Sequence, residues 1–233
     1  YTNDWFYSSV LRLNSLNAIS GFPDNTFKPH NYTTKAEFVK ILLDAFRVPI
    51  ERGYSFSDTK DHWSSNYVST AIANGIISYN TYNDRFEPDS FITRIEMATM
   101  ILSMLNVRYI DGESPFDDIS SKVASTAFHE CLIMGSIKNG KRYFNPHSSV
   151  TRAEVSAVIV RAIDYMENPE AYKRNCTQEI AKQEKLIKEQ IQEIQTQKLY
   201  DTLVKPSAVI AEITENAKLF SSYHTSSGVI GTV

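Results

Sequence analysis

The clearest pattern along the chain is an amphipathic one that occurs three times. Apolar residues stand at positions i, i+3, i+4, i+7 and i+8 of segments that begin at Phe38, Met97 and Val155. This spacing is typical of one apolar stripe along an α-helix. The other stripe residues are Ile41, Leu42, Ala45 and Phe46, then Met100, Ile101, Met104 and Leu105, then Val158, Ile159, Ala162 and Ile163. We predict three helices that bury these stripes against one another with rough threefold symmetry.

Shorter motifs recur around these helices in a fixed order, and they identify a repeat. A four-residue motif at residues 34–37 returns at residues 93–96 and 151–154, with its glutamates 59 and 58 residues apart. The upstream matches are Phe27-Lys28-Pro29 with Phe86-Glu87-Pro88 and Phe144-Asn145-Pro146, and Ile19-Ser20-Gly21 with Ile77-Ser78-Tyr79 and Ile133-Met134-Gly135. Each repeat is predicted to be a helix, a turn-rich loop and a second helix.

The motifs divide the chain into repeats at residues 1–48, 49–108 and 109–168, and the first repeat lacks its N-terminal part. We therefore expect the chain to be a piece of a longer protein. The first helix of a repeat begins near Trp5 in the first copy and near Trp63 in the second, whereas the third copy has no tryptophan there.

After the third repeat the pattern changes. Residues 170–203 are charged and rich in glutamine, with a thin apolar line. The line consists of Ile180, Ile187, Ile191 and Ile194. This composition predicts a long polar helix that acts as a stalk or packs on a partner. We expect a further helix at residues 207–220 and a linker at residues 221–233, so that residues 169–233 form a helical stalk and linker region.

The recurring four-residue motif opens each central helix. Its threonine can cap the helix, and its glutamate three residues later can reach back to the cap, which makes a capping box. The pairs are Thr34 with Glu37, Thr93 with Glu96, and Thr151 with Glu154. We interpret these six residues as structural.

The cation inside the motif is not explained by capping. Lys35, Arg94 and Arg152 occupy the first helical position, where the helix macrodipole disfavours a positive charge by ~0.3–1 kcal/mol. The same choice in three repeats suggests that the cation and free N–H groups of the helix start hold an anion together. Arginine can grip a carboxylate through two parallel hydrogen bonds, whereas Lys35 offers a point charge. The alternative, that each cation pairs with a nearby Asp or Glu, stays open.

Composition and charge exclude several classes of protein. The formal net charge of −3 and a pI near 6.0 argue against a broad nucleic-acid surface. The chain contains no uncharged apolar run of about 18 residues, which is the length needed to span a membrane. The five histidines show no metal-ligand spacing, and no nucleophile with a matching base can be named. We predict no catalytic residue, no metal site and no cofactor, and therefore a protein that is not an enzyme.

The chain has two cysteines, which is too few for a disulfide framework. Cys131 lies in an apolar run of four residues, Cys131-Leu132-Ile133-Met134. Because nothing in the sequence places Cys176 close to it, we expect Cys131 to be a buried free thiol.

These motifs resemble those of the S-layer homology (SLH) domains of bacterial surface proteins. Thr151-Arg152-Ala153-Glu154 is identical to the Thr-Arg-Ala-Glu motif of that family, and Asp24-Asn25-Thr26-Phe27-Lys28-Pro29 differs by one residue from its Asp-Gly-Thr-Phe-x-Pro loop. The resemblance covers roughly residues 1–166. It implies a mainly α fold in which three helix-loop-helix repeats form a three-pronged bundle with pseudo-threefold symmetry, here followed by the long polar helix.

The resemblance also implies a function and a site. SLH domains bind secondary cell wall polysaccharide non-covalently through terminal mannosamine-type sugars that carry a pyruvate ketal, so the implied location is extracellular, in the cell wall or S-layer of a Gram-positive bacterium. The implied partner is an anionic cell wall polysaccharide in grooves between repeats. The implied binding residues are Lys35, Arg94, Arg152, Trp5, Trp63, Gly21, Asp24 and Asn25.

Three questions stay open at this stage. The tryptophans could instead pack in the core, because tryptophans are mostly buried. The grooves should be unequal, because the second repeat has Tyr79 where the first has Gly21. The repeats could also serve as an assembly module that binds other S-layer subunits in a surface lattice.

Overall fold

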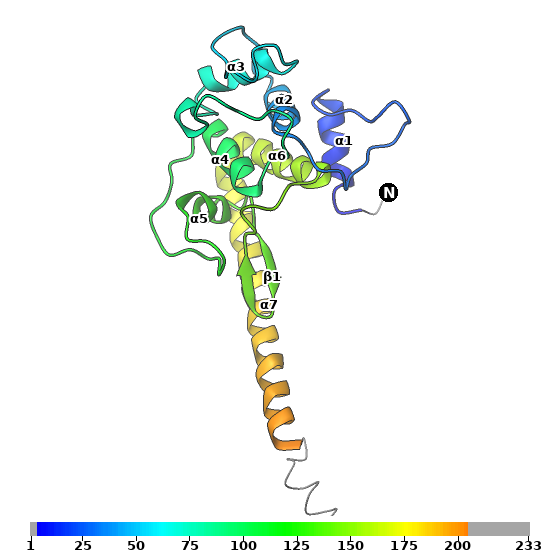
Figure 1. Cartoon of the computed structure of the whole chain (residues 1–233). Coiled ribbons are helices and arrows are strands. Elements are labelled where there is room, and N and C mark those ends of the chain that lie inside the picture. The colour runs from blue at the N-terminus through cyan, green and yellow to red at the C-terminus, as the bar shows by residue number, and fades with distance from the viewer. Residues whose placement is uncertain (1–3, 205–233) are drawn as a thin grey trace, which may run out of the picture.

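The computed structural model describes residues 4–204, which form a head of short helices and one long helix that leaves it (Figure 1). The mainly α fold is confirmed. In chain order the helices and strands are α1 (Tyr7–Ser15), α2 (Lys35–Ala45), α3 (Ser65–Ala73), η1 (Tyr79–Thr81), α4 (Arg94–Met104), α5 (Lys122–His129), β1 (Ser136–Lys138), β2 (Lys141–Tyr143), α6 (Arg152–Glu167) and α7 (Pro169–Val204).

The centre of the head is built from α2, α4 and α6, whose apolar stripes are the ones seen in the sequence. All stripe residues are buried except Phe46, Met104 and Leu105, which are partly buried and pack against the same core. The three stripes are buried in one hydrophobic core, which α2, α4 and α6 share with the outer helices packed against them. The equivalent places of the three stripes in this core give the head its pseudo-threefold centre.

A closed ring of backbone hydrogen bonds joins the three repeats at this centre. Thr33 N–H donates to the carbonyl of Val150 (2.9 Å), Val150 N–H to Ile92 (3.2 Å), and Ile92 N–H back to Thr33 (3.0 Å). The three residues directly precede the capping threonines. The ring therefore fixes the three helix starts relative to one another.

Each central helix begins against the loop of the next repeat. In α2, the N–H groups of Lys35 and Ala36 donate to the carbonyls of Ser90 and Pro88, both at 2.9 Å. The same two bonds run from α4 to Ser148 and Pro146, and from α6 to Asn31 and Pro29. The third N–H of each helix donates to the capping threonine, and all three predicted capping boxes are confirmed. The docking order is circular: first repeat on second, second on third, third on first.

The first helix of each repeat packs outside this centre. α3 lies against α2, α5 against α4, and α1 against α6, so each outer helix pairs with the central helix of the preceding repeat in the ring. These three pairs are the prongs of the head. The repeat boundaries drawn from the sequence stay a prediction.

The third repeat departs from the expected loop. Its residues 136–143 fold into an antiparallel hairpin, β1–β2, with the turn at Asn139-Gly140, where φ is 53° and 73°. Two residues with positive φ form the tight turn that matches strand twist, and Asn-Gly is its preferred sequence. A turn-rich loop was expected in each repeat, so these two strands were not predicted.

The expectation of a free Cys131 thiol is wrong. Cys131 is bonded to Cys176, with their Cα atoms 5.6 Å apart and a sequence separation of 45. The helix α7 begins one residue after α6 and runs past the end of α5, which brings Cys176 to Cys131. That direction depends on tertiary packing, and no local pattern in the sequence shows it.

The long polar helix predicted after the third repeat is confirmed as α7. The further helix at residues 207–220 and the linker at residues 221–233 lie outside the described residues. Within residues 4–204, no helix has both the length and the apolar character needed to cross a membrane.

Candidate functional site

The three motif cations occupy equivalent places at the starts of α2, α4 and α6, and each reaches across to the next repeat. The Lys35 ammonium is buried, 3.2 Å from Glu96 Oε1 and 3.5 Å from Glu87 Oε2, and it donates to the Phe86 carbonyl at 3.3 Å. It also lies 5.3 Å from the centre of the Tyr82 ring. Three acceptors therefore satisfy its three donors.

Arg152 is buried in the same way, but its partners are mainly carbonyls. Its Nε donates to Phe27 O (3.1 Å) and its Nη2 to Ser20 O (2.9 Å), while the rings of Phe22 and Phe27 lie 4.9 and 4.8 Å from the guanidinium carbon. Burial lowers the pKa of Arg152, and the charge of Glu37 opposes that shift. The guanidinium thus ties the third repeat to the loop of the first.

Arg94 is only partly buried and makes fewer bonds. Its Nη1 donates to Glu154 Oε1 at 3.1 Å, and its guanidinium carbon lies 5.9 Å from the centre of the Phe144 ring. Its Nε is buried and has no hydrogen-bond partner among residues 4–204, and Nη2 has none within that range. A buried donor without a partner is costly, so Arg94 retains capacity for a further acceptor.

The reason for this difference lies in the hairpin. Ser20, whose carbonyl accepts from Arg152, corresponds to Met134 in the third repeat. The Met134 carbonyl already accepts from Arg142 of β2, at 2.9 Å. Arg94 therefore meets a loop whose equivalent acceptor is occupied.

The idea that free N–H groups of the helix starts hold an anion is wrong. The first two N–H groups of each helix donate to loop carbonyls of the next repeat, and the third donates to the capping threonine. Sequence alone could not show this, because the acceptors come from another repeat.

The pairing of cations with acidic neighbours, left open above, is seen at two junctions. One oxygen of Glu96 caps Thr93 and the other faces Lys35; Glu154 likewise caps Thr151 and faces Arg94. Glu37 is the acidic neighbour of Arg152. The glutamate of the motif thus has two roles: it caps its own helix, and it neutralises the cation of the preceding repeat.

The two tryptophans are on the surface, which excludes their packing in the core. Trp5 is 63% exposed and Trp63 is 54% exposed. Trp5 contacts the edge of Phe6, and Trp63 lies 6.4 Å from Tyr67, measured between ring centres. Exposed indoles offer flat apolar faces with a polar N–H, which suits contact with a partner.

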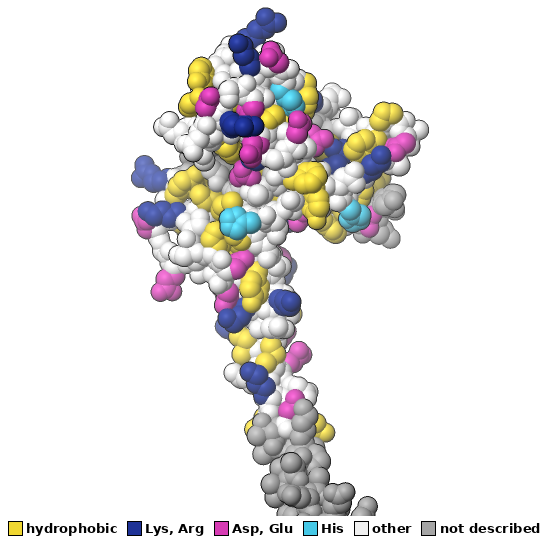
Figure 2. Space-filling view, viewed as in Figure 1, with side chains coloured by type: hydrophobic (Ala, Val, Ile, Leu, Met, Phe, Trp, Pro, Cys, Tyr) yellow, Lys and Arg dark blue, Asp and Glu magenta, His cyan; other side chains and the backbone are white. Residues whose placement is uncertain are grey.

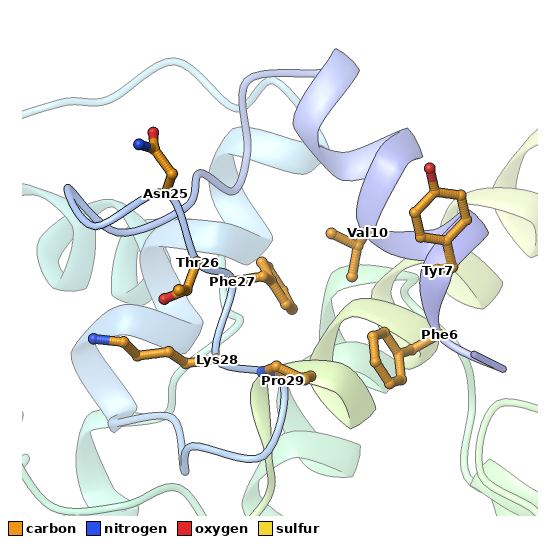
Figure 3. A pocket seen from close by; sticks show the side chains of 8 residues that line it. All are labelled: Phe6, Tyr7, Val10, Asn25, Thr26, Phe27, Lys28 and Pro29. Carbon is orange, nitrogen blue, oxygen red and sulfur yellow. The ribbon is translucent and has the colours of Figure 1, made fainter. Parts of the chain in front are cut away.

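Two hollows lie in the first repeat, between α1 and the loop that follows it. One has a volume of about 440 Å³, with Tyr7 and Val10 of α1 and the preceding Phe6 on one side and residues 25–29 on the other. Figure 3 shows Phe6, Val10 and Phe27 pointing into this space, with Asn25 and Lys28 turned away from it. The second, of about 450 Å³, includes Gly21 and Asn25 in its lining. The sequence analysis missed the α1 side, because Phe6, Tyr7 and Val10 belong to no recurring motif.

The loop beside these hollows is held by Asp24. Its Oδ1 accepts from the Thr26 hydroxyl (2.6 Å) and N–H (3.0 Å), and Lys28 lies 2.9 Å from Oδ2. The Thr26 hydroxyl bond, followed by the Lys28 bond, lowers the pKa of Asp24 to about 2. Gly21 lies close to this turn, since a Cβ there would be 3.1 Å from the Thr26 carbonyl.

The structure therefore brings some predicted site residues together and separates others. Trp5, Gly21, Asp24 and Asn25 gather in the first repeat, where Phe27 and Ser20 link them to Arg152. Trp63, Lys35 and Arg94 belong to the other two junctions. The face in Figure 2 shows acidic and basic side chains interspersed over the head, so no single-sign field dominates it. Within residues 4–204, no group of three or more His, Cys, Asp or Glu could hold a metal ion.

The family model and the similar proteins agree with each other on one family. The family model of the S-layer homology domain matches residues 1–39 and 55–98, which confirms the resemblance in these two regions. An uncharacterized cell wall amidase of Bacillus anthracis is 29% identical over 163 residues, 68% of this chain and 30% of the relative. S-layer protein EA1 of Bacillus anthracis is 27% identical, and an S-layer protein of Bacillus licheniformis 28%, each over 161 residues, 66% of this chain and 18% of the relative. The chain thus spans 18% to 30% of the length of these relatives.

Proposed function

Because the chain carries S-layer homology repeats, we propose that it anchors a bacterial cell-surface protein to the wall by binding an anionic polysaccharide. The names of the relatives support a surface location, since they include S-layer proteins and a wall amidase. The chain matches less than a third of that amidase, which fits a role as an anchoring part rather than a catalytic one.

Arg94 is the observation that carries the proposal. Of the three equivalent cations, Lys35 has three acceptors and Arg152 donates through both Nε and Nη2, whereas Arg94 donates through Nη1 alone and keeps a buried Nε without a partner among residues 4–204. A carboxylate is the acceptor that such a fork binds best, through two parallel hydrogen bonds. A sugar that carries a pyruvate ketal offers that carboxylate.

The first repeat supports contact with sugar rings. Its two hollows are lined by apolar faces and by backbone and amide groups, and the exposed Trp5 contacts Phe6, which lines the first of them. Sugars present apolar C–H faces and hydroxyl groups, so this mixture of surfaces suits them. We propose that the polymer is held at unequal sites, with its acidic group at Arg94 and further rings at Trp5, Asn25 and Gly21.

The test is a calorimetric titration, in which a pyruvylated mannosamine fragment is added to the protein and the heat of binding is measured. Arg94→Ala should weaken binding about 10- to 100-fold, because a hydrogen bond to a charged group contributes ~1.5–3 kcal/mol. Removing the ketal from the fragment should weaken its binding to the wild-type protein by a similar factor. The affinity of Arg94→Ala should be the same for the fragments with and without the ketal.

Arg108→Ala is the matched control, because it removes the same charge from an exposed residue. It should bind within about twofold of wild type, since exposed charges are screened by salt. If Arg94→Ala bound the fragment as tightly as the wild-type protein does, the role of Arg94 would be refuted. If the wild-type protein bound fragments with and without the ketal equally well, an anionic ligand would be refuted.

One observation favours a second function, assembly with other surface subunits. Tyr32 and Phe91 are both exposed, and their ring centres are 5.4 Å apart beside the bridges that join the repeats. An exposed aromatic pair is a common feature of protein interfaces. Pull-down with wall sacculi before and after removal of the polymer separates the two functions, since binding that survives removal favours assembly.

A further inference from the structure

The helix α7 is attached to the third repeat near its own start. The Tyr172 hydroxyl donates to the Cys131 carbonyl (3.1 Å), the Lys173 ammonium lies 3.0 Å from Glu130 Oε2, and Cys176 is bonded to Cys131. Burial raises the pKa of the Tyr172 hydroxyl to about 12, as expected for a ring enclosed between two helices. This end of α7 is therefore held by one covalent and two polar contacts.

The hairpin β1–β2 holds α7 further along. Arg142 is 5% exposed, its guanidinium carbon lies 4.5 Å from the centre of the Phe128 ring, and it donates to Gln183 Oε1 of α7. About two helical turns further along α7, the Gly140 N–H donates to Gln190 Oε1 at 3.2 Å. Figure 1 shows the hairpin lying along α7 below the head.

The tip of the hairpin touches α7 so closely that only glycine fits. A Cβ on Gly140 would lie 2.4 Å from Ile191 Cγ1, and its φ of +73° is itself unfavourable for other residues. The predicted apolar line of α7 is thus partly covered by this chain's own hairpin, at Ile191.

The equivalent place in the first repeat is open. There Asn14, Ser20 and Asn25 border the hollow of about 450 Å³. In the third repeat, Arg142 fills the corresponding space, reaching Phe128 and the Met134 carbonyl, and Gln183 of α7 meets it from outside. The third repeat therefore differs from the first in the features that receive α7.

The joint between α6 and α7 is a single residue. Asn168 has φ −155° and ψ 82°, and its side-chain oxygen accepts from the Ala171 N–H at 3.0 Å. A joint of one residue has two soft dihedral angles and cannot by itself fix the direction of a 36-residue helix. The lateral contacts with the third repeat must do so.

We propose that the third repeat is a mount that holds α7 in one direction, and that the Cys131–Cys176 disulfide decides whether α7 is fixed or swings about Asn168. An external dithiol can open the bond: it is oxidised to a disulfide, and its two electrons and two protons convert Cys131 and Cys176 to thiols. The contacts that remain are all non-covalent: the Tyr172 and Lys173 bonds near the start of α7, then Gln183, Gln190 and Ile191 at the hairpin. Non-covalent contacts of this kind open locally, so the disulfide is the one bond that cannot open on its own. This role of the third repeat as a mount for α7 is independent of the ligand that the head binds.

The test measures the distance between the head and α7 by pulsed electron spin resonance. Thioether-linked nitroxides are placed at two exposed positions, with Asn66→Cys on α3 and Thr196→Cys on α7. With the disulfide intact the distance distribution should be narrow. In a Cys131→Ser, Cys176→Ser background it should be at least twice as broad, and an unchanged width would overturn the proposal.

Two controls keep the result interpretable. A label pair within the head, at Asn66 and Arg108, should stay narrow in both backgrounds, which shows that the head is folded. Where the serine variant fails to fold, the native cysteines opened by dithiothreitol give the same comparison. Broadening under the dithiol supports the proposal, and a width equal to that of the oxidised protein contradicts it.

Discussion

The junction at Arg152 and the junction at Arg94 begin from the same four-residue pattern and end in different states. Both arginines open a central helix, both face the loop of the next repeat, and both have a capping glutamate nearby. Arg152 spends its donors on the Ser20 and Phe27 carbonyls. Arg94 does not bond the equivalent carbonyl, that of Met134, which accepts from Arg142 instead. A motif therefore fixes where a cation stands, while the neighbouring loop decides whether it remains available.

The largest expected effect is on stability. Arg152→Ala should lower the free energy of unfolding by about 3 kcal/mol, because it removes a buried guanidinium whose charged donors hold the Phe27 and Ser20 carbonyls of the first repeat. Arg94→Ala should lower it by about 1 kcal/mol or less, since its single ion pair is partly exposed. Urea unfolding of the two variants measures the difference. Equal losses would show that the two junctions are not distinct.

A smaller effect should appear in binding when the competitor of Arg94 is removed. Arg142→Ala frees the Met134 carbonyl, so Arg94 can satisfy itself as Arg152 does. Affinity for the pyruvylated fragment should then fall about 3- to 10-fold, which is ~1 kcal/mol. Calorimetry measures it, with Lys138→Ala as a control on an exposed residue of the same hairpin. Unchanged affinity in Arg142→Ala would mean that the hairpin does not keep Arg94 available.

The smallest effect is a pH dependence in the loop that accepts Arg152. The pKa of Asp24 is lowered to about 2 in the folded protein, from an ordinary value of 3.8. A lowered pKa means that Asp24 stabilises the loop above pH 4 and that this contribution is lost as the pH falls towards 2. Carbon-detected NMR titration of the carboxyl should show a midpoint near 2, and Thr26→Val should move it upwards. A midpoint of 3.8 in wild type would show that the Thr26 and Lys28 bonds do not form in solution.

Much of the fold was visible in the sequence because its signals are local. The stripes of α2, α4 and α6 repeat with helical period, and each capping box lies within four residues. The polar helix α7 was predicted from composition alone. The hairpin had a signal too, since Asn139-Gly140 is the preferred two-residue turn, but its strands are only three residues long.

The features that escaped prediction all depend on contacts between distant segments. The pairing of Cys131 with Cys176 requires the direction of α7. The N–H groups at the helix starts looked free because their acceptors, such as Ser90 and Asn31, lie in other repeats. For the site, the sequence identified three cations as equals, and only the groups around them show that the buried donor without a partner belongs to Arg94.

The hydrogen-bonded ring of Thr33, Ile92 and Val150 has an evolutionary consequence. Open solenoids gain or lose copies by recombination, because each unit needs only its immediate neighbours. Here the last unit closes onto the first, so a duplication or deletion of one unit would leave one helix start and one loop without their hydrogen-bonding partners in the ring. The copy number of three is therefore locked by topology, and divergence is confined to changes inside each unit, as the hairpin of the third one illustrates.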